Sequence, residues 1–248
     1  MIDANDRAEA LRTSAFYDRA AASYDADVDG TPVNRALRDA FRARVALLAG
    51  QAGTILDFGA GTGTDAAWYA ERGHRVVAYD PSAGMMAALE RRCAAEIARC
   101  TIVPVLGDVD QFERALGAVA PVDVVAANFA VLNHVRDLGP LLATLGAALR
   151  PGGALVACLL NPLHRADLRR PGWWRVLALS LATGRVTATG AVTTHRHFTW
   201  SVRRMAWPAF ELVERGRLDG DGGWTTDPTP WRELTSREFH VVVLRRRA

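Results

Sequence analysis

The chain has 248 residues, half of them apolar and 23% charged, which is enough for a globular protein with a sizeable core. All 30 basic residues are arginine, so the sequence excludes mechanisms that need a lysine, such as P-loop phosphate binding, Schiff-base chemistry and tyrosine–lysine dehydrogenases. The net charge of +3 and the pI near 9.0 come from arginines that alternate with acids along most of the chain, so no nucleic-acid partner is expected.

The start of the chain, MIDANDRAEA, is acidic and lacks the apolar segment of a secretory signal. No stretch reaches the ~20 apolar residues that span a bilayer, so we expect a cytoplasmic protein without stable membrane insertion. The three cysteines lack metal-site spacing, and no metal is expected. Cys93 and Cys100 lie seven residues apart in a predicted helix and are interpreted as buried thiols on one face.

Two segments in the first fifty residues, 8–22 and 34–48, have apolar residues near helical spacing and are predicted to be helices. The pattern then changes to five short apolar runs separated by helix-sized segments: TILDF, RVVAY, TIVPVL, VDVVAA and ALVACLL. Parallel strands need long crossovers, which are usually helical. The alternation therefore predicts an α/β fold with a Rossmann-like, doubly wound, mostly parallel sheet.

The alternation stops after residue 161, where the stretch LRRPGWWRVLALSLATG precedes a predicted strand over 192–198. The segments AFELVERGRL and EFHVVVLRRR flank a loop rich in Gly, Asp and Pro, and we expect them to complete the sheet, with an antiparallel strand at the C-terminus. We predict a single domain with four parts. These are an N-terminal helical cap (1–50), a cofactor-binding core (51–160), a substrate-side insertion that includes a helical lid (161–207) and the final strands (208–248).

The segment ILDFGAGTGTDAAWYAERGHRVVAYD connects the first two predicted strands through a glycine-rich turn. Ligands of doubly wound sheets bind where strands end, and glycines let the backbone approach them. Asp80 closes the second strand, where a carboxylate can accept hydrogen bonds from two ribose hydroxyls. A dinucleotide would fit this pattern nearly as well, but an NAD fingerprint aligned on Gly59 and Gly61 would place its third small residue at Thr64.

Asp57, two residues before the first glycine, argues against a dinucleotide because its carboxylate would repel a pyrophosphate. The same carboxylate would stabilise an ammonium or sulfonium cation in a partly desolvated turn. S-adenosylmethionine combines those cations with adenine and ribose. Asp108 follows the third predicted strand, where it could accept a hydrogen bond from adenine N6.

Five segments in order, LDFGAGTGTDA, VVAYDPSAGMM, GDVDQF, FAVLNHV and LRPGGALV, resemble the motifs of class I S-adenosylmethionine-dependent methyltransferases over residues 50–160. The resemblance implies S-adenosyl-L-methionine as the cofactor, and a small-molecule member of the class. It implies cofactor contacts from Tyr17, Tyr24, Asp57, Gly59, Ala60, Gly61, Gly63, Asp80, Pro81, Met85, Asp108, Val109, Asn128 and Phe129. The sequence leaves open which of the two tyrosines faces the cofactor.

The need for a catalytic base depends on the acceptor atom. An amine or carbon nucleophile can react with orientation alone, whereas a hydroxyl usually needs a base. The candidate bases are His134, which follows the fourth predicted strand, and His195 and His197, which share a strand face. His164 is interpreted as an exposed loop residue.

The acceptor site is expected in the part of the chain that departs most from the family. Six of the seven tryptophans lie between Trp173 and Trp231. These tryptophans are suited to binding a planar or apolar acceptor, and they are equally suited to filling a hydrophobic core beneath the insertion. Residues 171–182 are interpreted as a lid helix, with a helix lying on a membrane surface as the alternative.

The expected function is methylation of an oxygen or nitrogen in a small, apolar or aromatic molecule, such as a specialised metabolite or a quinone-like compound. A methyltransferase-like protein with a non-methylating reaction such as cyclisation, or with a binding role, is the alternative. Methylation of nucleic acid or protein is disfavoured because the segment ANFA departs from the base-flipping PPY tetrad. A homodimer is one assembly that the sequence allows.

Overall fold

A computed structural model describes residues 4–119, 121–162, 173–218, 224–226 and 239–247. His164 and Trp231, singled out from the sequence, lie outside these residues. No helix in the described part of the chain is both long and apolar enough to cross a membrane. The division of the chain into cap, core, insertion and final strands remains a prediction.

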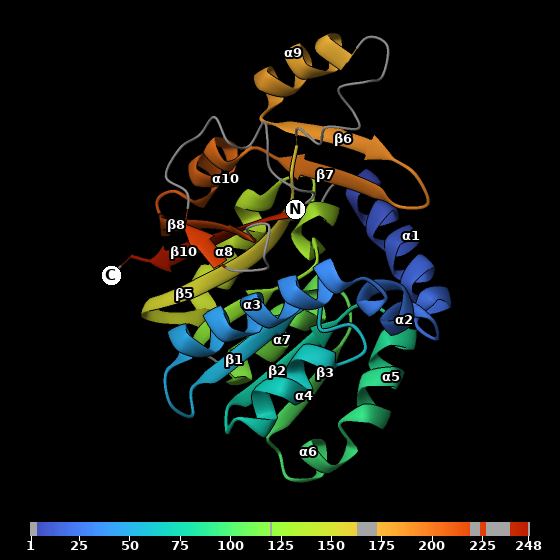
Figure 1. The fold of residues 1–248 in the computed structure, drawn as a ribbon, viewed down its shortest axis with the longest axis vertical. Helices are drawn as coiled ribbons and strands as arrows, with labels where there is room; N and C mark the ends of the chain where they lie inside the picture. The colour runs from blue at the N-terminus through green and yellow to red at the C-terminus, as the bar shows by residue number, and fades with distance from the viewer. Residues whose placement is uncertain (1–3, 120, 163–172, 219–223, 227–238, 248) are drawn as a thin grey trace.

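The main sheet has the strand order β3-β2-β1-β4-β5-β10-β8-β9 (Figure 1). Its parallel strands are β1 (Thr54–Phe58), β2 (Arg75–Asp80), β3 (Ile102–Leu106), β4 (Val122–Ala127) and β5 (Leu149–Leu160). The strands β10 (Phe239–Arg246), β8 (Phe210–Leu218) and β9 (Trp224–Thr226) continue it with antiparallel pairing. The predicted α/β fold is thus confirmed, including the antiparallel C-terminal strand.

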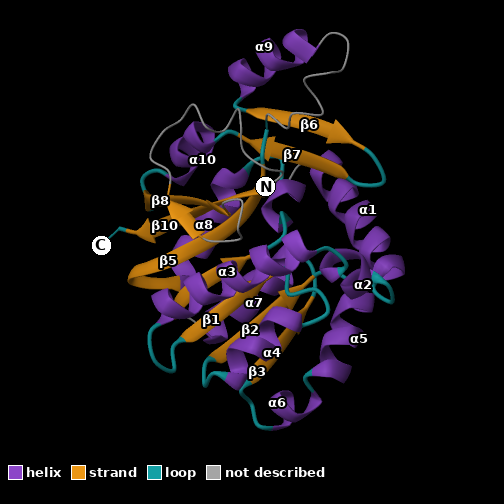
Figure 2. Cartoon of the chain, viewed as in Figure 1, coloured by secondary structure: helices purple, strands orange, loops and turns teal. Residues whose placement is uncertain are grey.

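The helices begin with α1 (Ala4–Ala20), α2 (Tyr24–Asp29), α3 (Pro32–Ala49), α4 (Thr64–Glu71), α5 (Ala83–Arg92) and α6 (Ala94–Ala98). They continue with α7 (Val109–Val119), the 3-10 helix η1 (Val131–His134), α8 (Leu138–Ala148), α9 (Trp173–Thr183) and α10 (Thr199–Ala206). Strands β6 (Arg185–Thr189) and β7 (Thr193–His197) form a separate antiparallel hairpin between the main sheet and α9 (Figure 2). The strand predicted over 192–198 is therefore present, but it lies outside the main sheet.

Apolar side chains fill both faces of the sheet because successive strand residues point to opposite sides. Ile55 faces a cluster that includes Phe41 of α3 and Tyr69 of α4. Leu56, the next residue of β1, faces the other cluster, with Leu142 of α8 and Val202 of α10. This two-sided burial explains why the central strands are almost continuously apolar.

The first fifty residues contain three helices where two were predicted. The additional helix, α2, has six residues, too few to show a helical apolar period, and none of them is buried. A separate N-cap begins α3, where the Thr31 hydroxyl accepts the N–H of Asn34 at 3.2 Å before Pro32.

The expectation of buried free thiols is confirmed for Cys93 and Cys158, but it was wrong for Cys100 and for the shared helix face. Cys93 is buried between α5 and α6, whereas Cys100 follows α6, is exposed and has a left-handed φ of 57°. The chain breaks its helix between the two residues, so their sequence spacing does not give them a common face.

Candidate functional site

The glycine-rich turn connects β1 to α4 at the carboxyl edge of the sheet, beside the point where the strand order changes from β1 to β4. Gly59 has a φ of 77°, and a Cβ at this position would overlap the Val131 side chain of η1. The N–H groups of Gly59 and Ala60 both donate to the Tyr79 carbonyl at 2.8 Å. Gly63 caps α4 with a φ of 81°, and a Cβ there would lie 2.7 Å from Leu89 Cγ. The turn therefore needs glycine for its backbone and for its packing.

Asp80 ends β2 beside this turn. Its Oδ2 accepts the N–H of Gly61 and its Oδ1 accepts the N–H of Ser82, both at 2.8 Å. Burial raises the pKa of Asp80 to about 6, although the two hydrogen bonds oppose the shift. Because a carboxylate oxygen has two lone pairs, each oxygen can still accept a hydroxyl hydrogen.

Asp57 is almost fully buried in β1, and its Oδ2 has no hydrogen-bond partner. Burial raises the pKa of Asp57 well above its usual range, and the charge of Asp65 raises it further. A buried acceptor without a partner is unfavourable in a folded protein unless a ligand supplies the donor. A cationic amino group of a ligand would supply it, and so the residues present fit an S-adenosylmethionine site.

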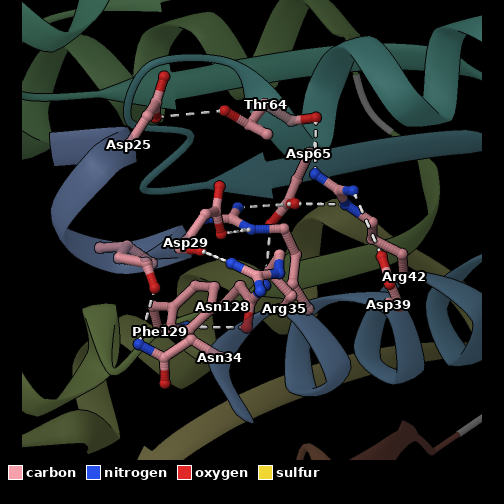
Figure 3. A network of polar contacts seen from close by, with 12 residues as sticks. Asp25, Asp29, Asn34, Arg35, Asp39, Arg42, Thr64, Asp65, Asn128 and Phe129 are labelled. Carbon is pink, nitrogen blue, oxygen red and sulfur yellow. Dashed lines mark hydrogen bonds and ion pairs between the residues drawn. The ribbon is translucent and has the colours of Figure 1, made fainter. Parts of the chain in front are cut away.

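A buried ionic network, which we call the Asp65 network, holds the turn against α3 (Figure 3). Asp65 Oδ1 accepts Arg38 Nη1 at 2.9 Å and Arg42 Nε at 2.6 Å, and Asp65 Oδ2 accepts Asn128 Nδ2 at 2.8 Å. Arg38 also donates to Asp29 Oδ1 at 2.9 Å. The sequence analysis did not identify Arg38 and Arg42. Their spacing of four residues on the buried face of α3 was a signal, because buried arginines need an acidic partner.

The segment after β4 carries two consecutive residues with left-handed backbones, Phe129 (φ 45°) and Ala130 (φ 64°). The Asn128 side chain accepts the Phe129 N–H at 2.9 Å while it donates to Asp65. The Arg38 guanidinium lies 4.6 Å from the centre of the Phe129 ring. Such backbones cost about 1–3 kcal/mol each and persist where the surroundings hold them. Asn128 and Phe129 thus shape this loop, and their contact with the cofactor remains a prediction.

Tyr17 of α1 and His134 of η1 form a hydrogen-bonded pair. His134 Nδ1 lies 3.2 Å from the Thr193 carbonyl, which can only accept, so Nδ1 carries the proton. The lone pair of Nε2 therefore accepts the Tyr17 hydroxyl hydrogen, with 3.0 Å between oxygen and nitrogen. Burial lowers the pKa of His134 and raises the pKa of Tyr17, so both groups are neutral near pH 7.

The two N-terminal tyrosines form one aromatic cluster beside the glycine-rich turn. The structure therefore does not single out one of them as the tyrosine that faces the cofactor. Tyr24 Cε1 would be 3.8 Å from a Cβ on Gly61, and the rings of Tyr24 and Tyr17 meet edge-on at 6.0 Å. The negative charge of Asp80 also acts on Tyr17. The pair formed by Tyr17 and His134 is thereby placed on the same side of the sheet edge as the turn and Asp80.

Helix α1 covers the loop that follows β2. Asp18 Oδ1 accepts the Ser82 hydroxyl at 2.6 Å and the Gly84 N–H at 2.9 Å, and the Ser14 hydroxyl donates to the Pro81 carbonyl at 3.0 Å. Met85 is buried in the first turn of α5. Helix α1 thus holds the loop that carries Pro81, while Met85 is buried behind it, and the cofactor contacts of both residues remain a prediction.

Asp108 caps α7 by a reciprocal pair of hydrogen bonds with Gln111. Its Oδ1 accepts the Gln111 N–H at 3.0 Å, and its own N–H donates to Gln111 Oε1 at 2.9 Å. The residue is exposed at the carboxyl edge of β3, and Val109 begins the helix behind it. An adenine contact by Asp108 and Val109 remains a prediction.

His195 and His197 are both buried on β7. His195 Nε2 donates to Glu9 Oε1 at 2.9 Å, and the Thr187 hydroxyl lies 3.0 Å from its Nδ1. His197 Nε2 donates to the Val135 carbonyl at 3.0 Å, and burial lowers the pKa of His197 to about 4. These contacts connect the hairpin to α1 and to the residues after η1. Of the three predicted bases, only His134 is paired with a hydroxyl beside the turn.

Comparison with known proteins decides the family. A family model described as a methyltransferase domain matches residues 55–153. The demethylmenaquinone methyltransferase of Thermobifida fusca (strain YX) is 31% identical over 194 residues, which cover 77% of this chain and 75% of that protein. This chain belongs to the class I S-adenosylmethionine-dependent methyltransferases. The resemblance seen in the sequence is confirmed, and the NAD alternative is set aside.

Further similarities agree with this assignment. A ubiquinone biosynthesis O-methyltransferase of Bradyrhizobium sp. (strain ORS 278) is 32% identical over 111 residues, which cover 43% of this chain and 40% of that protein. The structure of Burkholderia thailandensis 1,6-didemethyltoxoflavin-N1-methyltransferase, with its namesake compound and S-adenosylhomocysteine bound, has a TM-score of 0.61 at 19% identity, covering 100% of this chain and 92% of that one. This methyltransferase is thus an S-adenosylmethionine-dependent enzyme.

Proposed function

We propose that this methyltransferase methylates a hydroxyl oxygen of a small, apolar or aromatic molecule, with His134 as the general base. The observation that carries the proposal is the hydrogen bond from the Tyr17 hydroxyl to His134 Nε2, at 3.0 Å. A phenolic hydroxyl of the protein already occupies the position that an acceptor hydroxyl needs. The quinone-pathway relatives named above support a ring-bearing acceptor.

The cofactor would supply a methyl group on a cationic sulfur, which leaves as a neutral thioether. His134 would take the acceptor proton on Nε2 while the Thr193 carbonyl keeps Nδ1–H in place. The carboxylate of Glu9 favours the resulting imidazolium. An acceptor hydroxyl would replace the Tyr17 hydroxyl at Nε2, so Tyr17 and the acceptor compete for one lone pair.

The remaining site residues are proposed to bind and orient the cofactor. Asp57 has the unpartnered oxygen that would meet a cationic amino group, and Asp80 would accept the ribose hydroxyls. The Asp65 network would keep α3 and the turn at a fixed separation. We propose that His195 and His197 position the hairpin instead of exchanging protons, since His195 Nε2 contacts Glu9 of α1 and His197 Nε2 donates to the Val135 carbonyl after η1.

The test is an acceptor screen with product analysis. Phenols, hydroquinones and amines are incubated with the purified enzyme and S-adenosylmethionine, and mass spectrometry locates the added methyl group. We expect O-methylation, with a turnover about 10²–10⁴-fold lower in His134→Ala and an unchanged cofactor affinity. Methylation of amines only, or full turnover in His134→Ala, contradicts the proposed base. A cyclised product without an added methyl group would instead support the non-methylating alternative.

A further inference from the structure

Helix α10 and Trp207, the residue that follows it, expose two tryptophans and two arginines in one stripe. Trp200, Arg203, Arg204 and Trp207 follow the spacing of three and four residues that places side chains on one helix face. The two tryptophans are 43% and 62% exposed, and both arginines are exposed. The opposite face of the helix buries Val202 and Ala206 in the core beside α8. The core therefore holds the helix in place while the stripe faces outward.

The cations of this surface lie beside its aromatic rings. The Arg204 guanidinium lies 5.6 Å from the Trp200 ring centre, and that of Arg247 lies 4.3 Å from the Trp207 ring centre. Large aromatic rings next to positive charges match the boundary between lipid headgroups and acyl chains, where tryptophan is enriched.

The stripe continues to the end of α9. A Cβ on Gly184, the residue after α9, would lie 3.2 Å from Trp200 Cη2, so the Trp200 ring sits at the base of this helix. Leu179 and Leu181 of α9 are 68% and 52% exposed, and α9 lies at the outer end of the molecule beyond the hairpin (Figure 1). Leu179 and Leu181 stand on either side of the buried Ser180, so apolar side chains are exposed along both flanks of α9 as well as on the α10 stripe.

The excess of positive charge in the chain is concentrated in this region of the sequence. Residues 161–207 contain eight arginines and one aspartate, whereas the remainder contains 22 basic and 26 acidic residues. The net positive charge of the protein therefore comes entirely from the part of the chain that carries α9 and the whole stripe. An anionic partner is the electrostatic complement.

We propose that the α9–α10 face, defined by Leu179, Leu181, Trp200, Arg203, Arg204 and Trp207, binds the surface of an anionic phospholipid bilayer. The arginines would meet headgroup phosphates while the leucines and tryptophans enter the interfacial layer. RNA would match the arginines but not the exposed leucines. A second copy packed symmetrically on this face would bring like charges together. The proposal goes beyond the acceptor assignment and does not depend on it.

The experiment is vesicle co-sedimentation of the full chain. Vesicles of pure phosphatidylcholine are compared with vesicles containing about one third phosphatidylglycerol, at low and high salt. We expect binding to the anionic vesicles that weakens at high salt, because counterions screen the arginines. Combining Arg203→Ala with Arg204→Ala should weaken binding to the anionic vesicles about 25-fold, because each arginine contributes about fivefold. Trp207→Ala should weaken vesicle binding by the same factor at low and at high salt.

The matched control combines Arg91→Ala with Arg114→Ala, which remove two exposed arginines from α5 and α7. This control should bind vesicles like the parent protein. Equal binding to neutral and anionic vesicles, or equal loss in both double variants, overturns the proposal. So does binding of tRNA without vesicle binding, or self-association in size-exclusion chromatography that only the Arg203 and Arg204 variant abolishes. None of these readouts depends on the acceptor, so the proposal can fail while the proposed function stands.

Discussion

The hydroxyl of Tyr17 donates to Nε2 of His134 across 117 residues of sequence, with 3.0 Å between the two atoms. One partner lies on the N-terminal helix and the other on the 3-10 helix after β4. The pair therefore depends on how α1 packs beside η1 at the sheet edge. The base proposed for catalysis is in this way coupled to the segment that covers the cofactor site.

Replacement of Tyr17 with Phe is expected to favour the acceptor. The change removes the protein hydroxyl that competes with the acceptor for His134 Nε2. The acceptor then no longer has to break a hydrogen bond worth about 0.5–1.5 kcal/mol, so its KM should be about 2- to 12-fold lower. Steady-state kinetics with varied acceptor would measure it. A fall in kcat as large as that in His134→Ala, with KM unchanged, would mean instead that Tyr17 relays the proton.

Asp80→Asn should weaken cofactor binding by about 1.5–3 kcal/mol, because a charged acceptor becomes a neutral one. Calorimetric titration with S-adenosylmethionine and S-adenosylhomocysteine gives the affinity. Asp123→Asn is the matched control: Asp123 also accepts a backbone N–H, from Thr54 at 2.7 Å, but lies at the amino end of β4. Equal affinities for Asp80→Asn and the parent would refute the ribose assignment.

Cofactor affinity should depend on pH through Asp80. Its pKa in the ligand-free protein is about 6, and hydroxyl donors prefer the ionised carboxylate. The contribution of Asp80 to the affinity should therefore be full above pH 7 and fall as the pH drops through 6, by about tenfold between pH 7.5 and 5. Calorimetry at a series of pH values tests this prediction, and Asp80→Asn should flatten the acid side of the curve. An affinity that rises on acidification would contradict the sign of the effect.

The Asp65 network should contribute strongly to stability. Asp65→Ala would leave the buried guanidiniums of Arg38 and Arg42 without their shared carboxylate, and loss of one partner of a buried ion pair costs about 3–5 kcal/mol. Urea unfolding followed by circular dichroism measures the change. Asp39→Ala serves as the control, since Asp39 is exposed and lies 3.8 Å from Arg42. Its effect should stay below about 1 kcal/mol, and equal effects of both variants would show that the network is not stabilising.

The sequence by itself determined every strand of the main sheet except β9, the glycine-rich turn and the strand-end aspartates. Strand and helix periods are local properties, and the carboxyl ends of parallel strands share one edge. Asp57 and Asp80 could therefore be assigned to one site from their positions near the carboxyl ends of two buried strands. The same local signals predicted the antiparallel C-terminal strand but not the six-residue α2, which is too short to show a period.

Only the tertiary structure decided which side chains meet. Asp65 accepts a hydrogen bond from Arg38, which is 27 residues away in the sequence, and Glu9 accepts one from His195, which is 186 residues away. Sequence spacing treated the three histidines as equivalent candidate bases, whereas packing gave a tyrosine hydroxyl to His134 alone. The physical reason is that a hydrogen bond forms only when two atoms are positioned to within a few tenths of an ångström. That positioning follows from how the helices pack on the sheet, and not from the residues beside each partner in the sequence.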